Sequence, residues 1–245
     1  MPDYRLLYLQ NEGKLKIRKL LSEGHSAETV ELMMRRSEFH SPSVRPRDEE
    51  GDKLFSDLAD LLWDNEAEIR SRAARVLCWT AVFYPQSWIR LQERIAPRLL
   101  EMLKDDDPHV RGDVALAIVS MPSMNTGKLY SPEPHLMEKA IPALTNLLKD
   151  GNIQVERNAG WALGNVVVDW VLRNRGNHRI ALDIQSKLAD HKDAIVRSHV
   201  ADYWVLNAQA FPEAAVKARP LLMKLAMDVD DKVRELAEQS LNYLK

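Results

Sequence analysis

The sequence predicts an all-α fold built from repeated pairs of helices. Only nine of the 245 residues are glycine, and apolar residues recur mostly every three or four positions, the spacing of one face of a helix. An acidic turn that leads into an aliphatic residue, usually followed by arginine, occurs five times, at 64–70, 105–111, 150–156, 191–197 and 228–234. The final residues of these turns are 41, 45, 41 and 37 positions apart, a period typical of helical repeats.

Each acidic turn is expected to join the two helices of one pair. In three repeats a proline precedes the first aspartate of the turn by eight residues, at Pro97, Pro142 and Pro220. The aspartates can accept hydrogen bonds from the free N–H groups of the second helix, and they favour its positive dipole end. The turns therefore predict where each second helix begins.

This pattern resembles the HEAT repeat, a pair of antiparallel helices with proline in the first, an aspartate-rich turn, and Val-Arg opening the second. The resemblance covers roughly residues 53–245. The third repeat departs from it, because Glu156 stands where arginine is usual and Arg157 follows. The resemblance implies a right-handed α-α superhelix, or solenoid, whose second helices line a concave face commonly used to hold other macromolecules.

The second helices carry a common packing pattern. Four positions beyond the turn aliphatic residue they have small side chains, at Ala73, Val114, Ala159, Val200 and Ala237. Eight positions beyond it they have large apolar ones, at Leu77, Ile118, Leu163, Trp204 and Leu241. This alternation predicts a core in which stacked helices interdigitate.

One flank of the second helices predicts where neighbouring repeats come close. It is small or apolar in four repeats, with Ala74 and Cys78, Ala115 and Val119, Gly160 and Gly164, and Ala201 and Val205. The fifth repeat has Glu238 and Asn242 there, the polar outer face that a terminal repeat needs.

The predicted repeat array occupies residues 54–245, with helical pairs at 54–84, 88–121, 135–172, 178–209 and 213–245. Residues 1–40 contain two amphipathic stretches and are expected to form an N-terminal helical cap, or a further helical pair over 1–36. Residues 41–53 hold two prolines and mixed charges, which predicts a linker or surface loop. Residues 122–134 are expected to form a long loop between the second and third repeats.

Composition argues against several classes of protein. The formal net charge of −2 creates no general attraction for nucleic acid or an anionic membrane. No apolar run approaches the roughly 18 residues that span a bilayer, and the N-terminus lacks the apolar region of a signal peptide. The single cysteine, Cys78, fits a reducing compartment. We expect a soluble, cytoplasmic protein with no membrane partner.

Sequence motifs give no support for catalysis. The seven histidines are scattered without the spacing of a metal site, and the chain contains no P-loop, GxGxxG or GxSxG motif. Cys78 lies on the predicted flank between repeats, where a buried structural thiol is expected. We therefore expect no enzyme activity, no metal and no cofactor.

The stretch "NAGWALGN", residues 158–165, carries the main candidate for binding. On a helical wheel the core arc of this repeat is Val155, Ala159, Ala162, Leu163, Val166 and Trp170. Asn158, Trp161, Asn165 and Asp169 form a separate stripe, with Trp161 pointing most directly away from the core. This stripe predicts either contact with a ligand or packing of Trp161 beneath a loop such as 122–134.

"WALGN" also resembles the second-helix motif of armadillo repeats in nuclear-import adaptors. There a tryptophan stacks on peptide side-chain stems, and an asparagine four residues later bonds the backbone of an extended peptide. Trp161 and Asn165 match that pair, and no other repeat here has WxxxN. The resemblance implies that this chemistry can operate once in the chain.

The expected function is a non-catalytic scaffold or adaptor that binds a protein or peptide on the concave face. The residues expected to make the contact are Arg72, Arg75, Trp79, Leu116, Asn158, Trp161, Asn165, Asp169, His199 and Asp202. A regulatory subunit of an enzyme complex would have the same sequence features.

A nucleic-acid-binding protein is the alternative. DNA-alkylation-repair glycosylases also use HEAT-like repeats, and Trp161, Asp169 and Trp170 could take the place of their tryptophans and aspartate. Phosphate binding requires clustered cations, whereas the wheel places Asp113 and Asp202 beside the arginines. Nucleic acid is therefore the less favoured partner.

Overall fold

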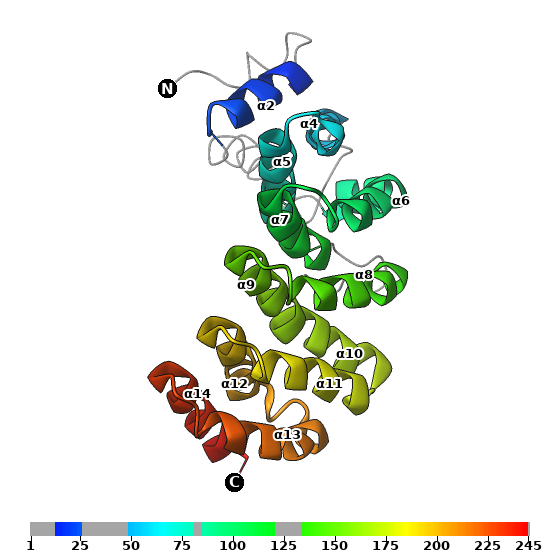
Figure 1. Ribbon diagram of the computed structural model, residues 1–245. Coiled ribbons are helices and arrows are strands. Elements are labelled where there is room, and N and C mark those ends of the chain that lie inside the picture. The colour runs from blue at the N-terminus through cyan, green and yellow to red at the C-terminus, as the bar shows by residue number, and fades with distance from the viewer. Residues whose placement is uncertain (1–12, 26–48, 81–84, 121–133, 245) are drawn as a thin grey trace. The chain divides into compact units, whose positions relative to one another are not determined.

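The computed structural model describes residues 13–25, 49–80, 85–120 and 134–244, and these residues form helices joined by short turns with no strand among them (Figure 1). The chain divides into two compact units, Met1–Leu136 and Met137–Lys245. The predicted all-α class is confirmed.

The first unit contains α2 (Gly13–Ser22), α4 (Glu49–Asp60), α5 (Ala67–Thr80), α6 (Pro85–Met102) and α7 (Pro108–Val119). A single 3₁₀ turn, η1 (Leu61–Trp63), continues α4. Helices α4 and α6 lie in one layer, and α5 and α7 lie side by side in the other (Figure 1). Helix α4 begins at Glu49, within the segment 41–53 that the sequence predicts as a linker.

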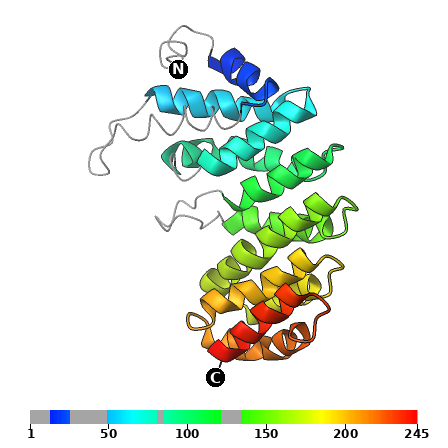
Figure 2. The ribbon, with the colours of Figure 1, turned by 90° about the vertical axis from the view of Figure 1, so that its left-hand side faces the viewer.

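The second unit holds most of α8 (Pro134–Leu147) and has three helical pairs, of which α8 begins the first. The second helix of its first pair consists of α9 (Ile153–Trp161), a π-helical turn η2 (Ala162–Val167) and α10 (Val168–Arg175). The remaining helices are α11 (His178–Ala189), α12 (Ala194–Asn207), α13 (Pro212–Leu225) and α14 (Asp231–Tyr243). Figure 2 shows α12 and α14 lying alongside each other in the layer of second helices.

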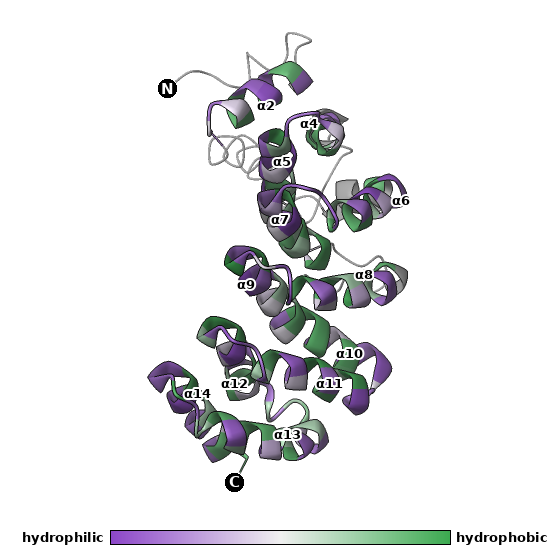
Figure 3. Cartoon of the chain, viewed as in Figure 1, coloured by the Kyte–Doolittle hydropathy of each residue, from purple (hydrophilic) through white to green (hydrophobic). Residues whose placement is uncertain are grey.

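The predicted core pattern is confirmed in the described repeats. All five residues at the small position are fully buried, as are Leu77, Ile118, Leu163 and Trp204 at the large position. Leu241 is only half-buried, because α14 packs on α12 and α13 and carries polar residues on its other side. Figure 3 shows hydrophilic and hydrophobic residues sharing each helix, as expected of helices with one buried face.

The acidic turns cap the second helices as predicted. The side chains of Asp107, Asn152, Asp193 and Asp230 each accept two backbone N–H hydrogen bonds from the first turn of the helix that follows. These bonds satisfy donors that have no partner within the helix. The caps fix the start of α7, α9, α12 and α14.

The glycine flank of the third repeat lies against α12. A Cβ atom built on Gly160 would lie 3.0 Å from Val196 Cγ1, and one built on Gly164 would lie 2.9 Å from His199 Cβ. Only glycine permits this approach without movement of α12. At the equivalent flank of α14, Glu238 and Asn242 are exposed, as the sequence predicts.

An arginine ladder joins consecutive repeats within each unit. We use this name for the ion pairs Arg18–Asp64, Arg70–Asp105, Arg157–Asp193 and Arg197–Asp228. In each pair the arginine near the start of one second helix reaches the acidic turn that precedes the next. The ladder explains why arginine and aspartate recur together in the repeat.

Helix α2 also belongs to this ladder, although the motif of the five acidic turns does not extend to it. Arg18 Nε donates to Asp64 Oδ2 at 2.6 Å, and Ile17 beside it is fully buried, like the aliphatic residue of each later turn. Helix α2 therefore takes the position of a second helix before α4. The rest of the predicted cap, residues 1–40, lies outside the described residues except for 23–25 and the helix itself.

The π-helical turn η2 shifts the core register of the third repeat. Val166 was expected in the core but is half-exposed, and Val167 is fully buried in its place. A π-turn closes its hydrogen bond one residue later than an α-turn, so the helix after it is rotated. Trp170 is buried as predicted.

Candidate functional site

The candidate site is the part of the second-helix layer that contains Trp161. We call it the Trp161 face and define it by Asn158, Trp161, Asn165, Asp169, His199 and Asp202, which come from α9, η2, α10 and α12 of the second unit.

Trp161 is the most exposed of these six side chains. It is 38% exposed, whereas Gly160, Ala162 and Leu163 beside it are buried. The residue ends α9 and directly precedes the π-helical turn, a feature that occurs often at functional sites. The predicted alternative, packing beneath residues 122–134, involves a segment outside the described residues.

Asn165 lies one turn beyond Trp161, against α12. Its Nδ2 donates to the Trp161 carbonyl at 3.3 Å and lies 3.5 Å from His199 Nδ1. Among the described residues, no group donates to Asn165 Oδ1. The amide therefore keeps an acceptor for an external N–H group.

His199 is held uncharged at neutral pH. Burial lowers the pKa of His199 below its usual value of 6.5, against the opposing influence of Asp202 and Asp193. A neutral imidazole can accept at Nδ1, which suits the position of the Asn165 amide. His199 acts here as a fixed polar neighbour of Asn165.

Asp169 has polar partners within the described structure, whereas Asp202 forms no ion pair with a described residue. Asp169 accepts from Arg173 Nε at 2.6 Å and from the Tyr203 hydroxyl at 3.4 Å. Burial, with Asp169 nearby, raises the pKa of Tyr203, so the phenol stays protonated and donates. Asp202 is half-buried and forms no ion pair with any described residue, which leaves its carboxylate available for an external cation.

Exposed apolar side chains continue the Trp161 face along the unit. Leu206 of α12 is 75% exposed and Tyr243 of α14 is 57% exposed. Both occupy positions that match the Trp161 stripe on the helical wheel. Asn158, at the other end, accepts from Gln154 Nε2 at 2.8 Å.

The candidate residues of the first unit are largely committed to local contacts. Arg75 forms a bidentate ion pair with buried Asp113, at 3.0 and 3.1 Å. Arg72 donates to the carbonyl groups of Leu21 and Ser22 at the end of α2. These contacts hold helices together, and binding by either arginine stays a prediction.

Two candidates of the first unit remain untested. Leu116 is half-buried on α7. Trp79 falls within α5, but its side chain lies outside the described ones.

Among the described residues, no three His, Cys, Asp or Glu side chains come together as a metal site. Burial raises the pKa of the Cys78 thiol, whose Sγ lies 3.1 Å from Ser120 Oγ, so the reactive thiolate is disfavoured. None of the described helices has the length and apolar character needed to cross a membrane.

Solved structures of helical repeat proteins match the chain over almost its whole length. An engineered protein is 20% identical with a TM-score of 0.56, and the match covers 96% of this chain and 97% of that one. The fold is a HEAT/armadillo-like α-solenoid. No protein-family model and no curated protein matches the chain.

Two designed proteins share this armadillo-like fold. A designed armadillo repeat protein in complex with the peptide (KR)4 is 21% identical with a TM-score of 0.53, over 94% of this chain and 98% of that one. Computationally designed armadillo repeat proteins for modular peptide recognition give 21% identity and a TM-score of 0.51, over 94% and 99%. These similarities establish the fold of the chain.

Proposed function

We propose that the chain is a non-catalytic scaffold that binds an extended protein segment on the Trp161 face. The observation that carries the proposal is Trp161, an indole 38% exposed on a helix whose neighbouring residues are buried. Tryptophan supplies a large rigid contact area at a small cost in conformational entropy. The free Oδ1 acceptor of Asn165, one helical turn away, suits a backbone N–H group of the bound segment.

Charge and aromatic character favour a basic segment. Asp202 offers an unpaired carboxylate on the same face, and the indole of Trp161 attracts a cation placed over its ring. The aliphatic stems of lysine and arginine can pack on an exposed indole while their charged ends reach the carboxylate. One designed armadillo repeat protein of this fold is in complex with the basic peptide (KR)4, which supports the choice of ligand class.

We further propose that the chain acts as a scaffold or adaptor in the cytoplasm. A helical repeat surface acts through contact area, which supports a scaffold or adaptor in place of an enzyme. The single cysteine agrees with a reducing compartment, so we place this role in the cytoplasm.

Binding of the (KR)4 peptide tests the proposal. Calorimetry with the full chain is expected to detect binding, and Trp161→Ala should weaken it about tenfold, the loss of about 1.4 kcal/mol. Trp63→Ala is the matched control, because Trp63 is also exposed, at 46%, but lies in the first unit. The control should bind like the wild type, and both variants should unfold within about 0.5 kcal/mol of it.

Two results would contradict the proposal. Equal affinity of wild type and Trp161→Ala would remove this face as the site. Binding of a DNA duplex with a steep salt dependence, stronger than binding of the peptide, would favour the nucleic-acid alternative.

A further inference from the structure

The acidic turn of the third repeat differs from the other turns in a way that the proposed function does not use. In the first and fourth repeats an arginine follows the aliphatic residue of the acidic turn. The Nη1 of this arginine donates to two backbone carbonyl groups of the same turn. Arg70 bonds Asp64 and Asn65 at 3.0 Å. Arg197 bonds the carbonyls of His191 and Lys192 at 2.9 Å.

Glu156 occupies this arginine position in the third repeat. Its side chain is 1% exposed, and its Oε1 accepts from the Gly151 N–H and from Lys192 Nζ, each at 3.1 Å. Gly151 has a φ of +94°, which glycine adopts readily. The turn thus offers a donor where the other turns offer carbonyl acceptors, and Arg157, one residue later, takes over the ladder contact with Asp193.

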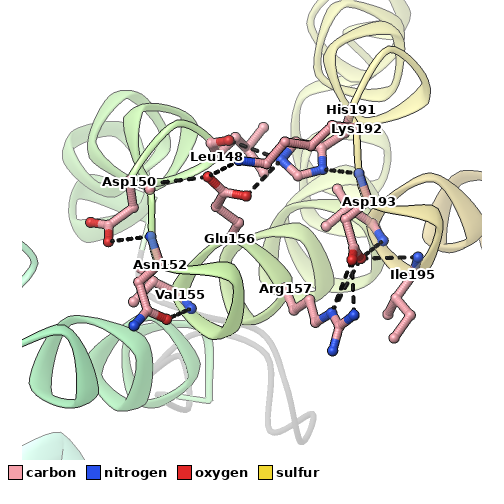
Figure 4. Close-up of polar contacts among 12 residues, drawn as sticks. Leu148, Asp150, Asn152, Val155, Glu156, Arg157, His191, Lys192, Asp193 and Ile195 are labelled. Atoms are coloured by element: carbon pink, nitrogen blue, oxygen red, sulfur yellow. Dashed lines mark hydrogen bonds and ion pairs between the residues drawn. The ribbon is translucent and has the colours of Figure 1, made fainter.

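The second carboxylate oxygen of Glu156 lacks a donor. Figure 4 shows the carboxylate directed at His191 and Lys192 of the neighbouring turn, and Oε2 lies 3.4 Å from His191 Nε2. His191 does not donate a hydrogen bond to this oxygen. Its Nδ1 accepts from the Asp193 N–H at 3.1 Å, so the ring hydrogen is on Nε2. Nε2 directs that hydrogen to the Leu148 carbonyl at 2.9 Å. Among the described residues, no group donates to this buried oxygen.

An open pocket of about 880 Å³ has Glu156 in its lining. Its walls come from the turns of the third and fourth repeats, and its charged lining consists of Lys149, Glu156, Lys187, Asp190, His191 and Lys192. Lys187 is paired with Asp183 at 2.6 Å, and Asp190 is paired with Lys224. Lys149 forms no ion pair with any described residue, so the rim carries one uncompensated positive charge, while Glu156 at the floor is paired with Lys192.

We propose that this pocket is a docking site for a partner-protein segment that presents an arginine guanidinium to Glu156 Oε2 and a neighbouring carboxylate to Lys149. In other repeats an arginine of the chain itself brings a guanidinium to the turn, whereas here Glu156 takes that position. Here the chain supplies the acceptor and leaves the donor to a ligand. Lys192, whose side chain is 67% exposed, moves off the carboxylate to admit it.

Other ligand classes fit the pocket less well. A metal ion would find no cluster of three ligands among the described residues. A free phosphate would meet the Glu156 carboxylate at the floor, where like charges repel. A ligand that carries both charges matches the floor and the rim together.

N-acetyl-L-arginine is the probe, because it carries one guanidinium and one carboxylate. NMR titration of the full chain is expected to shift the Gly151 amide and the His191 ring with millimolar affinity. Glu156→Gln should weaken this binding about tenfold, and Lys192→Gln should strengthen it severalfold, because the internal cation that competes for the carboxylate is gone. N-acetyl-L-citrulline, which has a similar shape without the positive charge, should not bind.

Matched variants separate this site from the Trp161 face. Glu213→Gln removes an exposed carboxylate of α13 and should leave binding unchanged, as should Trp161→Ala. Thermal unfolding verifies that Glu156→Gln is folded, and the Lys192→Gln result stands independently because that side chain is exposed. Absence of the Gly151 shift in wild type and Lys192→Gln, or equal binding of the citrulline probe, would overturn the proposal and leave the oxygen to solvent.

Discussion

Replacing Arg197 with alanine tests whether the arginine ladder stabilises the fold. Arg197 and Asp228 form an ion pair in which both side chains are about nine-tenths buried, with exposures of 11% and 9%. Two charge-assisted bonds of 2.7 Å join them. The alanine variant would leave the Asp228 carboxylate buried without its cation.

The expected loss is about 3 kcal/mol. Removing one partner of a buried ion pair costs about 3–5 kcal/mol, and the Asp230 N–H that still bonds Asp228 at 2.9 Å places this case at the lower end. For a chain of this size that loss lowers the melting temperature by about 6–12 °C. Arg157→Ala should cost less, because the Arg157 side chain is 35% exposed.

The pH dependence of this loss identifies its cause. The bonds from Arg197 hold the pKa of Asp228 below its usual value of 3.8. The stability they contribute is therefore complete above that value, and it is lost as the pH falls through the lower pKa of the folded state. In Arg197→Ala this contribution is absent, so the gap between variant and wild type should narrow below about pH 4.

Urea unfolding at several pH values between about 7 and 3 measures both effects. Lys232→Ala is the control, since Lys232 and Glu235 form a pair exposed at 66% and 57%, and it should change stability by less than about 0.5 kcal/mol. A loss below about 1 kcal/mol at neutral pH, or a gap that does not narrow in acid, would refute the reasoning.

Three further predictions concern close contacts and buried titratable groups. Gly164→Ala should lower the free energy of unfolding, measured in urea, by about 1–2 kcal/mol, because the new Cβ would lie 2.9 Å from His199 Cβ. The gain in helix propensity offsets only part of this cost. Gly160→Ala should cost less, because its new Cβ meets the side chain of Val196. The Cys78 thiol should react with a disulfide reagent at about pH 8 more than tenfold more slowly in the folded chain than in the chain unfolded in urea, because burial raises the pKa of Cys78. Equal rates in the two states would contradict that burial. NMR titration of His199 should give a midpoint below pH 6.5, because burial lowers the pKa of His199. The contribution of His199 to stability is therefore complete above pH 6.5 and is lost as the pH falls below it. A midpoint above 6.5 would be inconsistent with the packing of α12 on η2.

The features of the fold that rest on local patterns could be predicted from the sequence. Asp107 and Asp193 cap helices because a short carboxylate before a helix satisfies its free N–H groups wherever it occurs. The buried Ala159 and Val200 follow from helical spacing alone. Such features require no knowledge of distant residues.

The features that depend on distant contacts could not be predicted. Helix α2 could not be matched to the repeat motif because Arg18 precedes Arg70 by 52 positions, well outside the spacing of the other repeats. The shift of the core from Val166 to Val167 requires the π-helical turn, for which the helical wheel has no signal. Periodicity fails where an insertion or an irregular turn interrupts it.

The candidate site divides in the same way. The outward direction of Trp161 followed from the wheel, and the structure finds its side chain partly exposed. The engagement of Asp169 by Tyr203 and of Arg72 by the end of α2 depends on tertiary packing, so no sequence pattern signalled it. The substitution at Glu156 was visible in the alignment of repeats, but its unsatisfied oxygen required the position of His191.

The pairing of Gly151 with Glu156 restricts how this repeat can change over evolution. Arginine at 156 would place its guanidinium against the inward N–H of Gly151, where the other repeats provide carbonyl groups. A larger residue at 151 would be strained at a φ of +94° while Glu156 still required that N–H. Each single substitution is therefore unfavourable, and only the double change restores the usual turn. The two positions are therefore energetically coupled, and the double substitution is expected to cost less than the sum of the two single ones.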